Sequence, residues 1–189
     1  MKKLLLSLVF VCLIHFTKAQ LLSFTPDFPL DNSNLVITMD ATKGNKGLQG
    51  FAGPVYVHVG VITNLSTDPG NWRYVPFTWA TSNAAAEATN AGTNKWTYTI
   101  NNIRTFFNVP NSETILRVNI LFRNAAGTIV QRNINGSDMH LPVYAPGEFA
   151  IRFTSTPLQP TYNMVPEPIN AVNRSSVLVT VVSSQNEFL

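Results

Sequence analysis

Cysteine is almost absent from this chain. Cys12 is the only cysteine among the 189 residues, and it lies in an N-terminal segment that we expect to be removed. Disulfide bonds and thiol chemistry are therefore excluded for the mature protein. A hydrophobic core alone can stabilise the remaining ~170 residues, because a chain of that length buries most of the surface that it exposes when unfolded.

Charged residues are also scarce, at 12% of the chain. The sequence holds 13 Lys and Arg against 10 Asp and Glu, which gives a formal net charge of +3. Lys2, Lys3 and Lys18 belong to the N-terminal segment, so 13 minus 3 leaves 10 basic residues against 10 acidic ones. A mature chain without net charge lacks the basic surplus that is typical of nucleic-acid binding, and we expect no nucleic-acid partner.

Long apolar runs occur only at the N-terminus. Lys2 and Lys3 precede the apolar residues 4–16, and residues 17–19 (Thr-Lys-Ala) offer a cleavage site before Gln20. This pattern predicts a secretory signal peptide over residues 1–19, cleaved after Ala19. No later segment reaches the roughly 18 consecutive apolar residues of a membrane helix, so we expect a secreted or cell-surface protein without a membrane span.

Short stretches of alternating apolar and polar residues recur along the rest of the chain. They cover residues 35–39, 55–63, 95–100, 115–122, 128–132 and 139–144. Turn-forming Gly, Asn and Pro separate them, at residues 43–47, 68–70, 90–93, 124–127 and 135–136. Regular spacing of this kind predicts an all-β fold, an antiparallel Ig-like β-sandwich over residues 20–144. Residues 84–91 and 103–109 favour no more than short helical turns.

A domain boundary is expected near Tyr144. Residues 145–147 (Ala-Pro-Gly) break the pattern, and strand-like alternation begins again at 149–153. Prolines follow at 157, 160, 166 and 168, and another strand is expected at 177–182. Two strands cannot bury a core of their own, so we interpret residues 145–189 as a linker and the truncated start of a second Ig-like β-domain. The alternative is that both strands complete the first sandwich.

Several segments together resemble a known protein family. They are residues 55–63 (VYVHVGVIT), Trp72-Arg-Tyr74 with Trp79, residues 102–110 (NIRTFFNVP), residues 121–124 (LFRN) and residues 136–138 (GSD). Residues 26–29 (PDFP), 40–42 (DAT) and Gly47 resemble the start of the same module. Taken together in chain order, over residues 21–144, these segments resemble the N-terminal β-sandwich module of secreted α-amylase-family glycoside hydrolases from Bacteroidetes.

The resemblance implies an appendage that precedes a catalytic (β/α)₈ barrel acting on α-glucans. The partners implied are an α-glucan polysaccharide and a downstream catalytic domain of the same polypeptide. The catalytic carboxylates of the family lie in that barrel, so no residue of this chain inherits their roles.

The chain itself offers no recognisable catalytic centre. Asp68, Glu87, Glu113 and Asp138 are unpaired in sequence, whereas glycoside hydrolysis needs two carboxyl groups about 5 to 10 Å apart, and we interpret each as a turn or cap residue. The histidines at 58 and 140 lie in predicted strands without a third metal ligand nearby, so we expect structural histidines and no cofactor. We predict no catalytic residues in this chain.

Aromatic residues are the remaining candidates for a binding role. A flat indole complements the apolar C–H face of a sugar ring and loses little conformational entropy on contact. Trp72 and Tyr74 share one face if they belong to one strand, and Trp79 follows after a break expected at Pro76. We name Trp72, Tyr74 and Trp79 as candidate carbohydrate-binding residues, while Trp96 is expected in the core.

Three interpretations of the chain remain open. The first is a non-catalytic front module of an α-glucan-processing enzyme that contacts polysaccharide. The second is a structural spacer or interaction domain that only orients its neighbour. The third is a stand-alone surface glycan-binding protein, which requires that the chain end at Leu189.

Overall fold

The structure is a computed structural model, and it describes residues 21–155 and 180–184. The signal peptide expected at residues 1–19 lies outside these ranges, as do the prolines at 157, 160, 166 and 168. Of the strand expected at 177–182, residues 177–179 also lie outside them.

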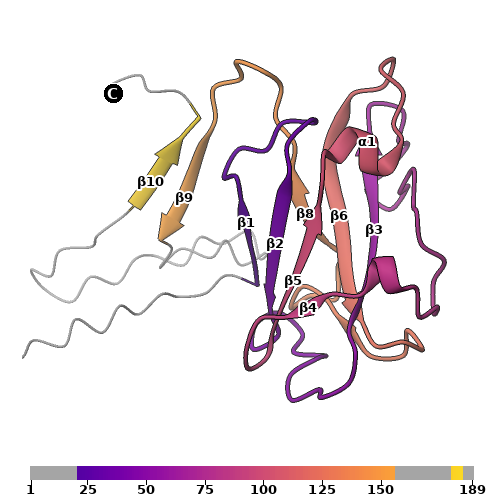
Figure 1. Cartoon of the computed structure of the whole chain (residues 1–189). Helices are drawn as coiled ribbons and strands as arrows, with labels where there is room; N and C mark the ends of the chain where they lie inside the picture. The colour runs from indigo at the N-terminus through magenta and orange to yellow at the C-terminus, as the bar shows by residue number, and fades with distance from the viewer. Residues whose placement is uncertain (1–20, 156–179, 185–189) are drawn as a thin grey trace, which may run out of the picture.

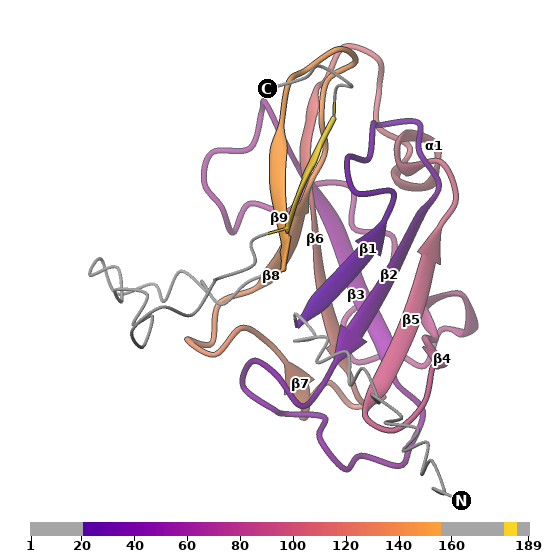
Figure 2. The same cartoon turned by 90° about the vertical axis from the view of Figure 1, so that its left-hand side faces the viewer.

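Two antiparallel sheets form the two layers of the molecule (Figures 1 and 2). The first has the order β1–β2–β5–β4, with bounds Leu22–Thr25, Leu35–Asp40, Lys95–Ile100 and Thr89–Asn90. In the second, β6 pairs with β3, β7 and β8, with bounds Ile115–Arg123 for β6 and Tyr56–Thr63, Val130–Gln131 and Met139–Pro142 for the others. The all-β sandwich predicted from the sequence is confirmed.

The core lies between the two sheets because alternate residues of each strand point inward. Trp96 is only 3% exposed, as expected for a core residue. The other inward-facing residues of the four longest strands are Leu35, Ile37 and Met39 of β2, Val57, Val59 and Val61 of β3, Tyr98 and Ile100 of β5, and Val118, Ile120 and Phe122 of β6.

Most of the predicted elements agree with the structure. β2, β5 and β6 match the strands expected at 35–39, 95–100 and 115–122, and α1 (Ile103–Phe107) falls within the helical turn expected at 103–109. The strands expected at 128–132 and 139–144 are shortened to β7 and β8.

Two short strands were not predicted. Residues 84–91 were expected to hold no more than a short helical turn, and η1 (Ala84–Ala86) is such a 3₁₀ turn. Thr89 and Asn90 of the same segment form β4, because they pair with Thr97 and Trp96 of β5. β1 had no sequence signal, since its four residues become a strand only by pairing with β2.

The strands β9 (Ile151–Ser155) and β10 (Thr180–Ser183) pair with each other in a two-stranded antiparallel sheet (Figure 1). They extend neither of the two larger sheets. The domain boundary near Tyr144 and the second β-domain stay predictions. In the two described ranges, neither short helix is long and apolar enough to cross a membrane.

From Val118 to Arg123, β6 is buried on both faces. Val118, Ile120 and Phe122 face the core, whereas Asn119, Leu121 and Arg123 face outward and yet are at most 3% exposed. In β3, which runs beside β6, Gly60 and Ile62 of the outward face are buried as well. A segment outside the sandwich must therefore cover this outer face.

Candidate functional site

The covering segment is the long loop at residues 64–83, between β3 and η1. Its main chain pairs with the edge of β3: Arg73 N–H donates to Val61 O over 2.8 Å, and Val61 N–H donates to Arg73 O over 3.0 Å. Gly60 makes this close approach possible, because a Cβ there would lie 2.9 Å from Val75 Cγ2 and 3.3 Å from Trp72 Cβ. A strand with a glycine at this position can hold a loop against its outer face.

A buried carboxylate fastens the same loop to the start of β6. Glu113 is 6% exposed and accepts two hydrogen bonds from Arg73, over 2.9 and 3.1 Å. Its side chain also accepts from the Tyr74 hydroxyl and, over 2.8 Å, from the Thr63 hydroxyl. The hydrogen bond from Tyr74, with those from Thr63 and Arg73, lowers the pKa of Glu113 despite its burial.

This network adds to one expectation and overturns another. Glu113 lies in a turn, as expected, where its N–H donates to Pro110 O over 3.0 Å, but its carboxylate is also the common acceptor of this network, which we call the Glu113 clamp (Thr63, Arg73, Tyr74 and Glu113). Tyr74 does not share a strand face with Trp72, because the loop is not a regular strand and Tyr74 adopts a φ of 53°. That conformation turns the phenol toward Glu113, so Tyr74 contributes to the clamp.

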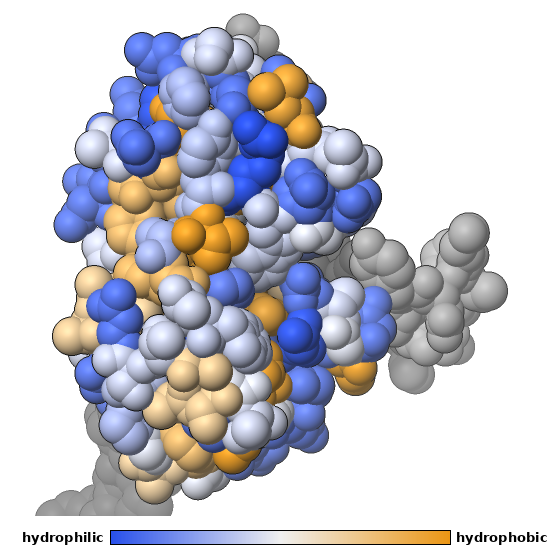
Figure 3. Space-filling model, turned by 90° about the vertical axis from the view of Figure 1, so that its right-hand side faces the viewer, coloured by the Kyte–Doolittle hydropathy of each residue, from blue (hydrophilic) through white to orange (hydrophobic). Residues whose placement is uncertain are grey.

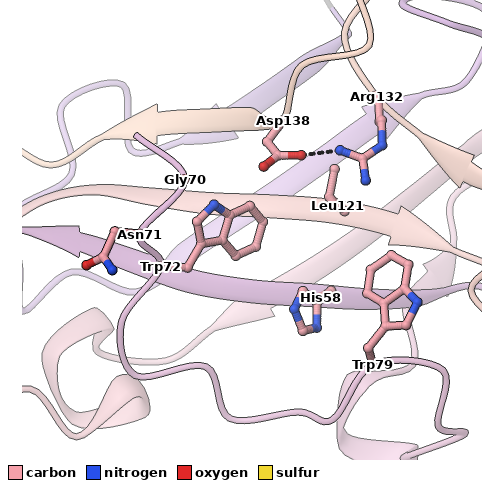
Figure 4. A pocket seen from close by; sticks show the side chains of 8 residues that line it. All are labelled: His58, Gly70, Asn71, Trp72, Trp79, Leu121, Arg132 and Asp138. Carbon is pink, nitrogen blue, oxygen red and sulfur yellow. Dashed lines mark hydrogen bonds and ion pairs between the residues drawn. The ribbon is translucent and has the colours of Figure 1, made fainter. Parts of the chain in front are cut away.

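Between the loop and the outer face of the β3–β6 sheet lies an open cavity of about 510 Å³ (Figure 4). Its walls come from β3, β6, the loop and the segment between β7 and β8. The lining residues are His58, Gly70, Asn71, Trp72, Trp79, Leu121, Arg132 and Asp138. On this side of the molecule, polar and apolar residues are interspersed at the surface (Figure 3).

Three rings dominate the cavity. His58 lies between the two indoles in Figure 4: its ring stacks on Trp72 with 5.6 Å between centroids, and meets Trp79 edge to face at 5.0 Å. Trp79 is 38% exposed, and Trp72 is half-buried. The two indoles therefore present aromatic surface to one solvent-open cavity.

His58 was expected to be a structural histidine with its hydrogen bonds satisfied, but its Nδ1 is buried without a hydrogen-bond partner. Burial lowers the pKa of His58 below its ordinary value of 6.5, the positive charge of Arg123 lowers this pKa further, and Asp138 opposes the shift. His58 is therefore a neutral imidazole at pH 7.

Two charged side chains line the rim of the cavity across from the three rings, and their charges neutralise each other. Arg132 and Asp138 form an ion pair across the segment between β7 and β8 (Figure 4). Each is about one-third exposed, so both reach solvent as well as the cavity. Asp138 had been interpreted as a turn residue, but its carboxylate belongs to this rim.

The structure brings together two of the three candidate residues. Trp72 and Trp79 line one cavity, whereas Tyr74 belongs to the clamp. Sequence reasoning missed Leu121 and Arg132 as lining residues and misjudged His58 and Asp138. Alternation in β3 could have placed His58 on the face opposite Val57 and Val59, but nothing in the sequence indicates that a loop crosses that face.

Within the two described ranges, no group of three His, Cys, Asp or Glu residues could hold a metal ion. Asp68 accepts a hydrogen bond from Gly70 N–H over 2.7 Å, so it is the turn residue that was expected. No model of a known protein family matches the chain, and no curated protein matches it either.

Proposed function

We propose that this protein is a secreted, non-catalytic β-sandwich module that contacts α-glucan chains through Trp72 and Trp79. The single observation that carries the proposal is the pair of indoles at one open cavity, with His58 between them. The sequence resemblance to the front module of α-amylase-family enzymes supplies the ligand class.

The chemistry of the cavity suits a neutral sugar chain. Sugar rings expose apolar C–H faces, and burying such a face against an indole removes apolar surface from water. Asn71, Arg132 and Asp138 at the rim can donate to and accept from hydroxyl groups. The lining therefore combines two indoles with several polar side chains, which can fix the orientation of a bound sugar.

We test the contact by titrating the purified chain with maltoheptaose in a calorimeter, using wild type and Trp79→Ala. We expect the Kd to rise about tenfold in the variant, which corresponds to about 1.4 kcal/mol. The matched control is Phe149→Ala, because Phe149 is an exposed aromatic residue (53%) that does not line the cavity. Circular dichroism shows whether each variant remains folded.

If the wild type binds and Trp79→Ala binds with the same Kd, the sugar does not contact the cavity through Trp79. If the wild type gives no heat of binding with maltoheptaose, the proposed binding function is contradicted.

The wider role of the module is a separate part of the proposal. We infer from the resemblance that the module precedes a catalytic barrel in one polypeptide. Sequencing the gene beyond the codon for Leu189 tests this: an open frame with paired carboxylates at barrel strand ends supports it. A stop codon at that point would favour the stand-alone surface glycan-binding protein instead.

A structural spacer is the second candidate, and one observation favours it. Both indoles also make contacts within the protein, Trp72 with His58 and Trp79 with His58 and Arg123. If packing is their role, the wild type binds no maltoheptaose and Trp79→Ala lowers only the free energy of unfolding.

A further inference from the structure

Arg123 is a fully buried cation at 0% exposure. Burial lowers the pKa of its guanidinium, and none of the ion pairs in the described part of the chain includes it. Burying a charge without a counter-charge costs free energy. A methionine would fill the same space without that cost, so the guanidinium must do something that an apolar side chain cannot.

Its hydrogen bonds go to main-chain carbonyls on two separate segments. Nη1 donates to Asn124 O over 2.9 Å and to Ala125 O over 3.0 Å, in the turn that follows β6. Nη2 donates to Thr81 O over 2.9 Å, near the end of the loop at residues 64–83. The planar guanidinium thus ties the turn to the loop only two residues beyond Trp79.

The same group also contacts the Trp79 indole itself. The guanidinium carbon lies 5.4 Å from the Trp79 ring centroid and 5.8 Å from that of Tyr56, within the range of cation–π attraction. Gly127, in the turn after β6, packs directly against the Trp79 indole. Its φ is +68°, and a Cβ there would lie 2.6 Å from Trp79 Nε1. Arg123 therefore contacts Trp79 at its ring and holds the main chain two residues further on, at Thr81.

We propose that Arg123 is the positioning residue that fixes the indole of Trp79 at the wall of the cavity. This inference rests on the proposed function, because it assigns a purpose to an indole that the ligand is expected to contact. Positioning an aromatic side chain before the ligand arrives removes the entropy cost of ordering it on binding. Lysine cannot replace arginine here, since an ammonium group lacks the planar fork that reaches three carbonyls and the flat face that stacks.

The test compares Arg123→Lys with Arg104→Lys. Arg104 is the matched control because its guanidinium also bonds several groups, including Pro110 O at 2.7 Å and Asp31 at 2.7 Å, and it does not line the cavity. Two readouts are taken on the folded chain: the order of the Trp79 indole N–H by nitrogen-15 NMR relaxation, assigned with Trp79→Phe, and the Kd for maltoheptaose.

We expect Arg123→Lys to make the Trp79 indole mobile and to weaken binding about tenfold, while Arg104→Lys changes neither readout. A Trp79 indole that stays as ordered in Arg123→Lys as in the wild type would overturn the positioning role. Equal loss of indole order in both variants would overturn it too, since any arginine clamp would then serve. A wild type that binds no maltoheptaose would contradict the proposed function, and the relaxation data would still decide what Arg123 does.

Discussion

At the scale of single residues, His58 shows how little a residue type says before its neighbours are known. The sequence places it in a strand of valines, where a hydrogen-bonded structural histidine is the ordinary expectation. In the structure its ring lies between two indoles, with a buried Nδ1 that has no partner. The cost of charging such a ring makes it a source of acid sensitivity.

We predict that the protein loses stability as the pH falls below about 6.5. The pKa of His58 in the folded state lies below its ordinary value of 6.5 because of burial and Arg123, so the unfolded chain binds more protons under mildly acid conditions. Burial and then Arg117 lower the pKa of His140 as well. Urea denaturation at pH 7.5 and pH 5 measures the difference in free energy of unfolding.

His58→Gln should remove part of this pH dependence, and His58→Gln with His140→Gln should remove more. An unchanged difference between the two pH values in the double variant would show that the histidines do not cause it.

At the scale of elements, the decisive feature is the contact between β3 and the loop at residues 64–83. Gly60 lets residues 72–75 pass close to β3, where Arg73 pairs with Val61 at the strand edge, and the Glu113 clamp fastens that stretch to the start of β6. This contact brings Trp72 over His58, while Pro69 and Thr81 of the same loop accept hydrogen bonds from Asn119 and Arg123 on the outer face of β6. The site therefore depends on a loop packing against a sheet.

We predict that Gly60→Val lowers the free energy of unfolding by about 1 to 3 kcal/mol, the usual range for overpacking. Its Cβ would lie 3.2 Å from Arg73 O, which is main chain and cannot rotate away. Thermal and urea unfolding measure the loss, and a change in Trp72 fluorescence reports displacement of the loop. Gly60→Ala is the graded control, with a smaller cost, and equal stability of wild type and Gly60→Val would contradict the close contact.

At the scale of the whole molecule, the two large sheets share one core, and β9 and β10 pair only with each other among the described strands. We therefore predict that a chain ending at Tyr144 folds and keeps its cavity. The comparison of residues 20–144 with residues 20–189 by circular dichroism and thermal unfolding checks this. A shorter chain that fails to fold, or melts well below the longer one, would mean that the sandwich needs the later residues.

The positions of the longer strands and the buried place of Trp96 could be predicted from the sequence. Alternation of apolar residues is a local signal, and it located β2, β5 and β6 and placed Trp96 inside. β1 and β4 could not be found in this way, because short strands exist only through their partners. Their pairing is a property of the assembled sheet.

The sequence by itself determined the all-β class, the scarcity of charge and cysteine, and the presence of tryptophans close together in one segment. Only the tertiary structure decided that Trp72 and Trp79 meet at one cavity while Tyr74 turns away to Glu113. The physical reason is that these positions depend on a non-regular loop, whose path follows from contacts with residues 40 or 50 positions distant, such as Arg73 with Glu113 and Thr63 with Glu113. Local periodicity carries no information about contacts at that range.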